Sequence, residues 1–196
     1  MRPVLLSASA LLLVAALAGC TTADPLAHQY ESGTNQNYIS GDGSVTVIAA
    51  ADRDAPVSFT ATTDAGDEIS SDDYAGQVVV INFWYAACPP CRVEAPALQK
   101  LHEDLAGTAS FLGVNVRDQA DTAKTFEEEV GITYPSVIDA NEGNMLLAFA
   151  GTVAPNAVPT TLVIDKKGRV AARFLGLIDA PSTLKTIITE TIAEDD

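Results

Sequence analysis

Two cysteines follow an apolar run in the middle of the chain, and they stand only two residues apart. The run at residues 78–83 (VVVINF) is nearly continuous in hydrophobic residues, as in a strand buried on both faces of a sheet. After four further residues come Cys88 and Cys91, with Pro89 and Pro90 between them. Such a pair can be a structural disulfide, part of a metal site or a redox-active dithiol.

The N-terminal segment indicates where these cysteines work. Residues 1–19 combine a basic start with an apolar run too short for the ~20 residues of a membrane-spanning helix, so they predict a cleaved signal peptide. Residues 17–20 (LAGC) resemble the lipobox of bacterial lipoproteins, which implies lipidation of Cys20. Ordinary secretion is the alternative. If Cys20 is lipidated, the two cysteines of the CxxC unit are the ones that remain. Exported domains that depend on structural disulfides carry several cysteine pairs instead.

The composition indicates one domain with an acidic surface. The chain has 196 residues, of which 47% are hydrophobic, so it can bury a core without cross-links. Its formal net charge of −15 repels phosphate backbones and argues against nucleic acid as a partner. Residues 20–43 are small and polar and predict a lipidated flexible tether. Residues 44–196 are expected to form the domain, as a monomer.

Strand and helix patterns alternate along this domain. The expected strands are residues 44–48, 57–61, 78–83, 111–116, 136–139, 160–164 and 169–174. The expected helices run from the CPPC segment to Gly107, over residues 121–130 and 144–150, and from about residue 181 onward. A βαβ half followed by a ββα half, with a CxxC at the first strand-to-helix junction, predicts an α/β thioredoxin-like fold. We expect a central mixed β-sheet flanked by helices, with an N-terminal strand extension.

From about Asp52 to the C-terminus the chain resembles exported thioredoxin-like proteins of the TlpA/ResA type. The matching stretches are residues 78–84 running into CPPC, residues 92–96, VPTT at 158–161, and the hairpin at 165–169. The resemblance implies a thiol–disulfide oxidoreductase that reduces disulfides in exported proteins, apocytochrome c among them. It also implies re-reduction by a membrane electron carrier, and no bound cofactor is expected. A disulfide-forming oxidant is the alternative.

The predicted chemistry places Cys88 where the strand ends and the helix begins. Unpaired N–H groups and the positive end of the helix dipole favour its thiolate there, and we expect its sulfur to be exposed to substrates. Cys91 falls on the same helix face, within reach of a disulfide. Cys88 is therefore expected to attack the substrate disulfide, and Cys91 to resolve the mixed disulfide.

Glu94 is a candidate proton acceptor for Cys91. Many thioredoxin-like proteins carry a buried acid on the strand, six residues before the first cysteine, but this chain has Asn82 there, which cannot titrate. Glu94 matches the acidic residue that follows the CxxC in ResA-type relatives. A helix-surface glutamate aligned with the dipole is the alternative.

Three further residues are candidates for substrate contact. Pro159 resembles the cis-proline that faces the CxxC in this fold, and Val158 before it would then pair with an extended substrate strand. Trp84 would shield the disulfide and contact partners, or act simply as a core residue. Ala87 departs from the family, which often has an aromatic residue there.

Two other chemistries fit less well. A metal site needs three or four converging ligands, but His28 lies in the tether and His102 would be ~16 Å along a helix from Cys91, so no metal is expected. A peroxiredoxin-like peroxidase would carry a threonine where this chain has Tyr85. A binding module with a merely structural disulfide is a third possibility. The expected location is the extracytoplasmic face of the cell membrane, held there by the lipid on Cys20.

Overall fold

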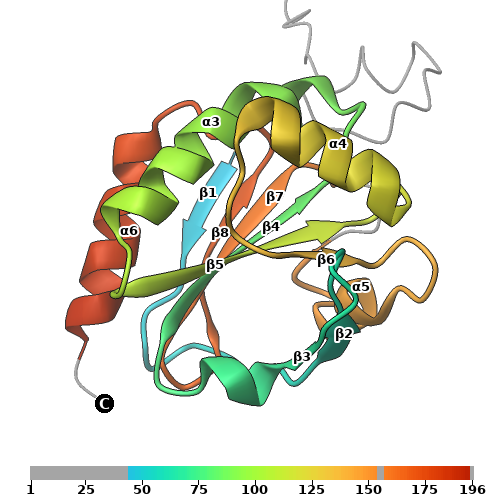
Figure 1. Ribbon diagram of the computed structural model, residues 1–196. Helices are drawn as coiled ribbons and strands as arrows, with labels where there is room; N and C mark the ends of the chain where they lie inside the picture. Colours follow the sequence, from blue (N-terminus) through green and yellow to red (C-terminus); the bar gives the residue numbers. More distant parts are fainter. Residues whose placement is uncertain (1–43, 154–156, 195–196) are drawn as a thin grey trace, which may run out of the picture. The chain divides into compact units, whose positions relative to one another are not determined.

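The apolar run before the CPPC segment forms a central strand of a six-stranded mixed sheet (Figure 1). A computed structural model describes residues 44–153 and 157–194. The strand order is β1-β8-β7-β4-β5-β6. The strands are β1 (Ser44–Val47), β4 (Val78–Trp84), β5 (Ala109–Asn115), β6 (Ser136–Ile138), β7 (Thr160–Ile164) and β8 (Val170–Leu175). Strands β4, β5 and β6 are parallel, whereas the β4–β7, β7–β8 and β8–β1 pairs are antiparallel.

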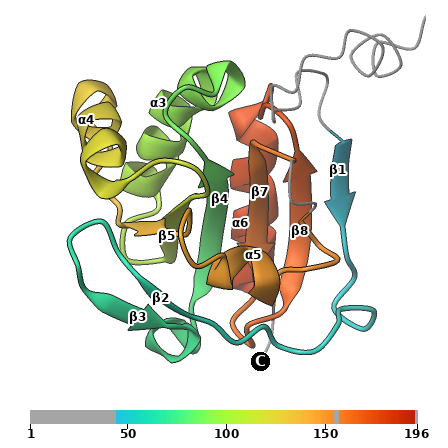
Figure 2. The same cartoon turned by 90° about the vertical axis from the view of Figure 1, so that its right-hand side faces the viewer.

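Helices cover both faces of this sheet, as Figure 2 shows. On one face lie α3 (Pro89–Asp104), α4 (Ala120–Val130) and α6 (Pro181–Ala193). On the other lie α5 (Asn144–Ala148) and the hairpin of β2 (Thr60–Thr62) and β3 (Glu68–Ser70), which the 3-10 turn η2 (Ser71–Tyr74) follows. The thioredoxin-like fold predicted from the sequence is confirmed.

Alternation along β4 decides which of its side chains face the CPPC helix. Successive side chains of a strand point to opposite faces. Val79, Ile81 and Phe83 pack into the core beneath α5. Asn82 and Trp84 therefore lie on the α3 face, beside the first turn of that helix.

One predicted strand is misplaced. Residues 57–61 were expected to form an edge strand, but β2 covers Thr60–Thr62 and pairs only with β3, outside the main sheet. Val57 and Phe59 instead lie partly buried against the core beneath α5, because their apolar side chains pack there and the Phe59 ring contacts those of Tyr74 and Phe149. The N-terminal extension β1 does join the sheet, next to β8.

Several predictions concern residues that are not described. The predicted signal peptide (residues 1–19), the tether (residues 20–43) and the lipidation site Cys20 lie outside the described residues. Within the described part of the chain, no helix combines the length and hydrophobicity needed to cross a membrane.

A buried ion-pair network joins three distant parts of the domain. The guanidinium of Arg53 donates to Asp165 at 2.9 Å and makes two contacts of 2.6 Å with the carboxylate of Glu194. The side chains of Arg53 and Asp165 are 2% and 4% exposed. The network thus ties the segment after β1 to the turn that follows β7 and to the residue that follows α6.

Replacing Arg53 should destabilise the domain. Arg53→Ala removes one of the two guanidinium partners of the buried Asp165 carboxylate and leaves only Arg169, so we expect the free energy of unfolding to fall by about 2 kcal/mol. Chemical denaturation at neutral pH measures the change. Lys100→Ala is the control, because Lys100 is 73% exposed and pairs with Asp104 on the surface, where removing an ion pair has little effect. Equal stability of Arg53→Ala and wild type would show that the network does not hold these segments.

Candidate active site

The CPPC cysteines lie at the junction of β4 and α3. Cys88 is the N-cap residue of α3, and it forms a disulfide with Cys91, across a Cα–Cα distance of 5.3 Å. The two cysteines are buried in one apolar cluster together with Trp84, Phe126 and Val158. The structure therefore brings the predicted dithiol and two of the predicted substrate-contact residues to one place.

The two prolines determine which helix donor reaches the sulfur of Cys88. The first turn of a helix has N–H groups without partners inside the helix. Pro89 and Pro90 occupy the first two helical positions and have no N–H. The first available donor is the N–H of Cys91, which donates to Cys88 Sγ at 3.3 Å. This donor and the helix dipole favour a thiolate at Cys88 in the reduced protein.

The expectation that the sulfur of Cys88 is exposed is wrong for this disulfide form. Cys88 is 0% exposed and Cys91 is 2% exposed. The physical reason is the surrounding cluster, in which apolar side chains from β4, α3 and α4 pack against the disulfide. Ala87 and Pro89 remain exposed on either side of Cys88.

The predicted substrate-contact residues adjoin the disulfide. The Val158–Pro159 peptide bond is cis, and the side chain of Val158 is buried in the cysteine cluster. Trp84 is 5% exposed, and its ring lies 5.0 Å from that of Phe126. The position of Trp84 suits a shield for the disulfide, and its contact with partners remains a prediction.

Gly113 on β5 provides the space for Trp84. A Cβ atom at Gly113 would collide with the side chain of Ser136 and would lie 2.9 Å from Trp84 Nε1. Only glycine therefore fits at this position beside the indole ring of Trp84.

Glu94 lies inside the protein, so the helix-surface interpretation is wrong. Its side chain is 2% exposed. Its Oε1 accepts a hydrogen bond from Asn82 Nδ2 at 2.8 Å, and its Oε2 accepts one from the backbone N–H of Ile178 at 3.0 Å. Asn82 also donates to Thr161 Oγ1 at 2.9 Å. Asn82, at the strand position that carries an acid in many relatives, thus holds an acid supplied by the helix.

Burial raises the pKa of Glu94 to about 8, because the charged carboxylate loses its hydration. The hydrogen bonds from Ile178 and Asn82 lower the pKa and offset only part of that effect. A second acid, Glu127 on α4, also has a raised pKa, about 7, again chiefly through burial. Two carboxyl groups on this face of the sheet therefore titrate near neutral pH.

Sequence reasoning missed Phe126, Asp118 and Glu127. Phe126 packs against Trp84 and lies beneath the guanidinium of Arg92, 5.0 Å from the ring centre. Asp118 Oδ2 accepts the backbone N–H of Ala86 at 2.6 Å and so fixes the loop before Cys88. For Phe126 and Glu127 the sequence held a signal, because Ala123, Phe126 and Glu127 share one helical stripe.

Comparison with known proteins decides the family. The AhpC/TSA family model matches residues 51–173, which is more than half of the chain. The chain belongs to the AhpC/TSA family. It is 34% identical to the thiol-disulfide oxidoreductase ResA of Geobacillus kaustophilus over 139 residues, covering 70% of this chain and 69% of that relative. It is 37% identical to the thiol:disulfide interchange protein HelX of Rhodobacter capsulatus over 101 residues, 52% of this chain and 53% of HelX.

Solved structures agree with this assignment. A DsbF homologue from Corynebacterium diphtheriae is 33% identical, with a TM-score of 0.69 over 78% of this chain and 96% of that one. A secreted thiol-disulfide isomerase from Corynebacterium glutamicum is 34% identical, with a TM-score of 0.70 over 80% and 96% of the two chains. This member of the family is a thioredoxin-like protein-disulfide oxidoreductase.

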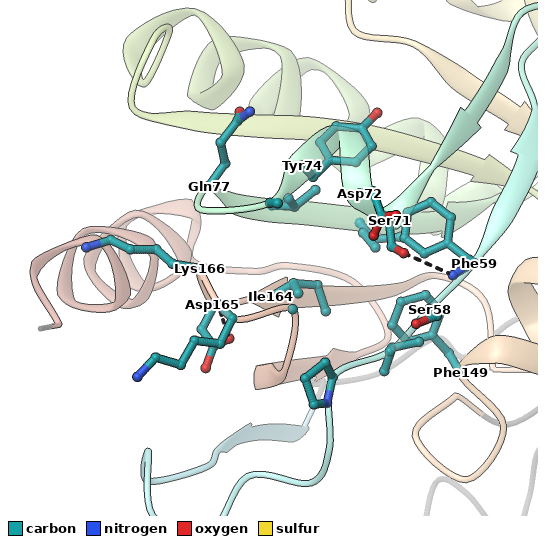
Figure 3. Close-up of a pocket in the computed structure, with 17 residues that line it drawn as sticks. Ser58, Phe59, Ser71, Asp72, Tyr74, Gln77, Phe149, Ile164, Asp165 and Lys166 are labelled. Carbon is teal, nitrogen blue, oxygen red and sulfur yellow. Dashed lines mark hydrogen bonds between the residues drawn. The ribbon is translucent and has the colours of Figure 1, made fainter. Parts of the chain in front are cut away.

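A separate cleft lies at the opposite end of the sheet. It occupies about 170 Å³, and Figure 3 shows Phe59, Tyr74 and Phe149 among its lining residues. Gln77 lies just before β4 and Asp165 just after β7, so the cleft is at the far end of both strands from the cysteines. No cysteine lines it, and we assign no thiol chemistry to it. Among the residues with described positions, no three His, Cys, Asp or Glu side chains form a potential metal site.

The buried acids should make the stability of the oxidised protein depend on pH. The pKa of Glu94 is about 8 in the folded chain against 4.5 for an unperturbed glutamate, so the folded state binds more protons between these values. The contribution of Glu94 to stability should therefore be greatest below about pH 4.5 and should fall as the pH rises to about 8. Glu94 alone contributes up to about 1.4 kcal/mol per pH unit. Chemical denaturation from pH 5 to 8 should show a smaller decline for Glu94→Gln.

The exposed Glu103 provides the matched control on the same helix. Glu103→Gln should retain the wild-type dependence on pH, because its side chain lies at the surface, where it accepts a hydrogen bond from Gln99. Identical slopes for Glu94→Gln and wild type would contradict the assigned state of Glu94.

Proposed function

We propose that this protein is exported, anchored to the membrane by a lipid on Cys20, and reduces disulfides in extracytoplasmic proteins. The lipobox-like end of the signal peptide supports the anchor, and the secreted relative from Corynebacterium glutamicum supports export. Apocytochrome c is the candidate substrate that the resemblance to ResA-type proteins suggests. A membrane electron carrier would return the electrons.

The observation that carries this proposal is the helix N–H directed at Cys88 Sγ. In the reduced protein the Cys88 thiolate attacks a substrate disulfide, forms a mixed disulfide and releases one substrate thiolate. The Cys91 thiol then loses its proton and attacks Cys88 Sγ. This attack closes the Cys88–Cys91 disulfide and releases the second substrate thiolate. Two electrons from the carrier and two protons from water restore the dithiol.

Glu94 is proposed to support proton transfer near Cys91 by remaining protonated, and so uncharged, while the Cys91 thiol ionises. Its carboxyl lies beneath the same helix turn, and with a pKa of about 8 it holds its proton near neutral pH. The hydrogen bonds from Asn82 and Ile178 keep both its oxygens in place.

Val158 and Pro159 are proposed to bind the substrate chain. The proposal is supported by the burial of Val158, which precedes Pro159, in the cluster that contains both cysteines. An extended substrate segment could then pair with the backbone at Val158 while its disulfide approaches Cys88. Trp84, in the same cluster, would contact the substrate when the disulfide becomes accessible.

Mutation of the cysteines separates their roles. Cys88→Ser should abolish reduction of insulin disulfides, because the attacking sulfur is lost. Cys91→Ser should instead accumulate mixed disulfides with substrate proteins, visible on non-reducing gels, because nothing resolves them. Cys20→Ser is the control: it should leave insulin reduction intact but release the protein from the membrane fraction. Wild-type turnover by either CPPC variant would refute these roles.

The direction of electron flow follows from the reduction potential of the Cys88–Cys91 pair. The same fold supports potentials from about −270 mV, in a reductant, to about −120 mV, in a strong oxidant. The alternative, a disulfide-forming oxidant, is supported by the names of two structural neighbours, a DsbF homologue and a thiol-disulfide isomerase. Equilibration with glutathione measures the potential, and we expect a value below about −220 mV. A value near −120 mV would reverse the proposed direction.

A further inference from the structure

A small cavity adjoins Cys91 on the α4 side. Trp84 and Phe126 provide apolar walls, and Asn82, Glu127 and Ser136 provide polar groups. Its volume of about 10 Å³ for the centre of a water-sized sphere is enough for about one water molecule. The resolving cysteine and Glu127 therefore line one small cavity.

Glu127 is buried there with unused hydrogen-bonding capacity. Its side chain is 8% exposed. Neither its Oε1 nor the nearby Ser136 Oγ makes a hydrogen bond of good geometry among the described residues, although the Ser136 hydroxyl is close enough to lower the pKa of the Glu127 carboxyl. Two buried polar atoms with incomplete pairing beside a reactive sulfur call for an explanation.

Glu94 does not provide that explanation. Both of its oxygens already accept hydrogen bonds, from Asn82 and from Ile178, and it is not one of the residues that line this cavity. Glu127 Oε1 makes no hydrogen bond of good geometry, and Glu127 shares the cavity with Cys91. The two acids thus differ in their access to the thiol.

We propose that Glu127 accepts the proton of the Cys91 thiol across this cavity during resolution of the mixed disulfide. The S–H bond of Cys91 breaks, and its proton passes to the Glu127 carboxylate through a water molecule held by Ser136. The Cys91 thiolate bonds to Cys88 Sγ, and the bond between Cys88 and the substrate sulfur breaks. The departing thiolate takes a proton from solvent, and Glu127 later returns its proton to solvent. This inference rests on the proposed function.

The charged groups around Glu127 fit this role. Burial and the charge of Asp64, in the turn between β2 and β3, raise its pKa, whereas Ser136 and Lys124 lower it, to a value of about 7. Burial is the main cause that raises the pKa of the Tyr134 phenol, and the charges of Glu94 and Glu127 raise it further. A base that is half-protonated near the working pH is well matched to proton transfer.

The test separates the two sulfurs by stopped-flow reaction of the reduced protein with 5,5′-dithiobis(2-nitrobenzoate). A Cys20→Ser background removes the third thiol. Attack by Cys88 releases the first coloured thiolate, and attack by Cys91 releases the second. In the parent protein the second phase should accelerate as the pH rises through about 7. Glu127→Gln should slow the second phase about tenfold at pH 8, remove that inflection, and leave the first phase unchanged.

Glu128→Gln is the matched control, because Glu128 is the next residue of α4 and is exposed. It should leave both phases unchanged. Ser136→Ala removes only a hydroxyl and should slow the second phase alone, which keeps the test decisive if Glu127→Gln does not fold.

An unchanged second phase in Glu127→Gln, or in Ser136→Ala when Glu127→Gln is unfolded, would overturn the inference. Equal slowing of both phases would overturn it as well, because it would indicate distortion of the whole site. Absence of the first phase in the parent protein would refute the proposed function instead.

Discussion

The chemistry of this protein depends on the junction where strand β4 ends and helix α3 begins. Strand β4 is buried along its whole length. After four intervening residues, α3 begins with two prolines, which have no N–H group. The first donor of the helix is therefore the N–H of Cys91, and it meets the sulfur of Cys88. The backbone geometry at this junction favours the thiolate of Cys88. This explains how a chain of net charge −15 can stabilise a further anion at its reactive centre.

Burial then links proton movement to electron movement. Strand β4 directs Asn82 and Trp84 toward α3, and the helix places Glu94 against Asn82. An acid taken out of water keeps its proton to a higher pH, so Glu94 is held nearly neutral at the pH where the thiols react. A charged carboxylate in this position would oppose the formation of a second negative charge at Cys91. Burying an acid such as Glu94 lowers the stability of the folded protein. A buried acid with a shifted pKa is common at functional sites, so this cost is consistent with a role of Glu94 in redox chemistry.

Patterns that depend on neighbouring residues were predictable from the sequence, and those that depend on tertiary packing were not. The CPPC junction and the strand and helix order follow from local patterns, which explains the correct fold. Residues 57–61 have a strand-like composition, but the side chains of Val57 and Phe59 pack against the core beneath α5. Burial of Cys88 depends on side chains from α4 and from the segment before β7, which are distant in the chain. Glu127 stands among three glutamates, and only its position on the Ala123–Phe126 stripe distinguishes it.

A buried disulfide limits which thiols can react with it. Exchange requires a thiolate to approach a sulfur directly, and both sulfurs lie beneath the apolar cluster of Trp84, Phe126 and Val158. A small thiol gains little from displacing these side chains, since it buries little surface of its own. A protein partner can offset that cost with contacts to the exposed Ala87, Pro89 and Val93, which surround the cysteines. The same packing that hides the dithiol can therefore favour protein partners over the small thiols of the surroundings.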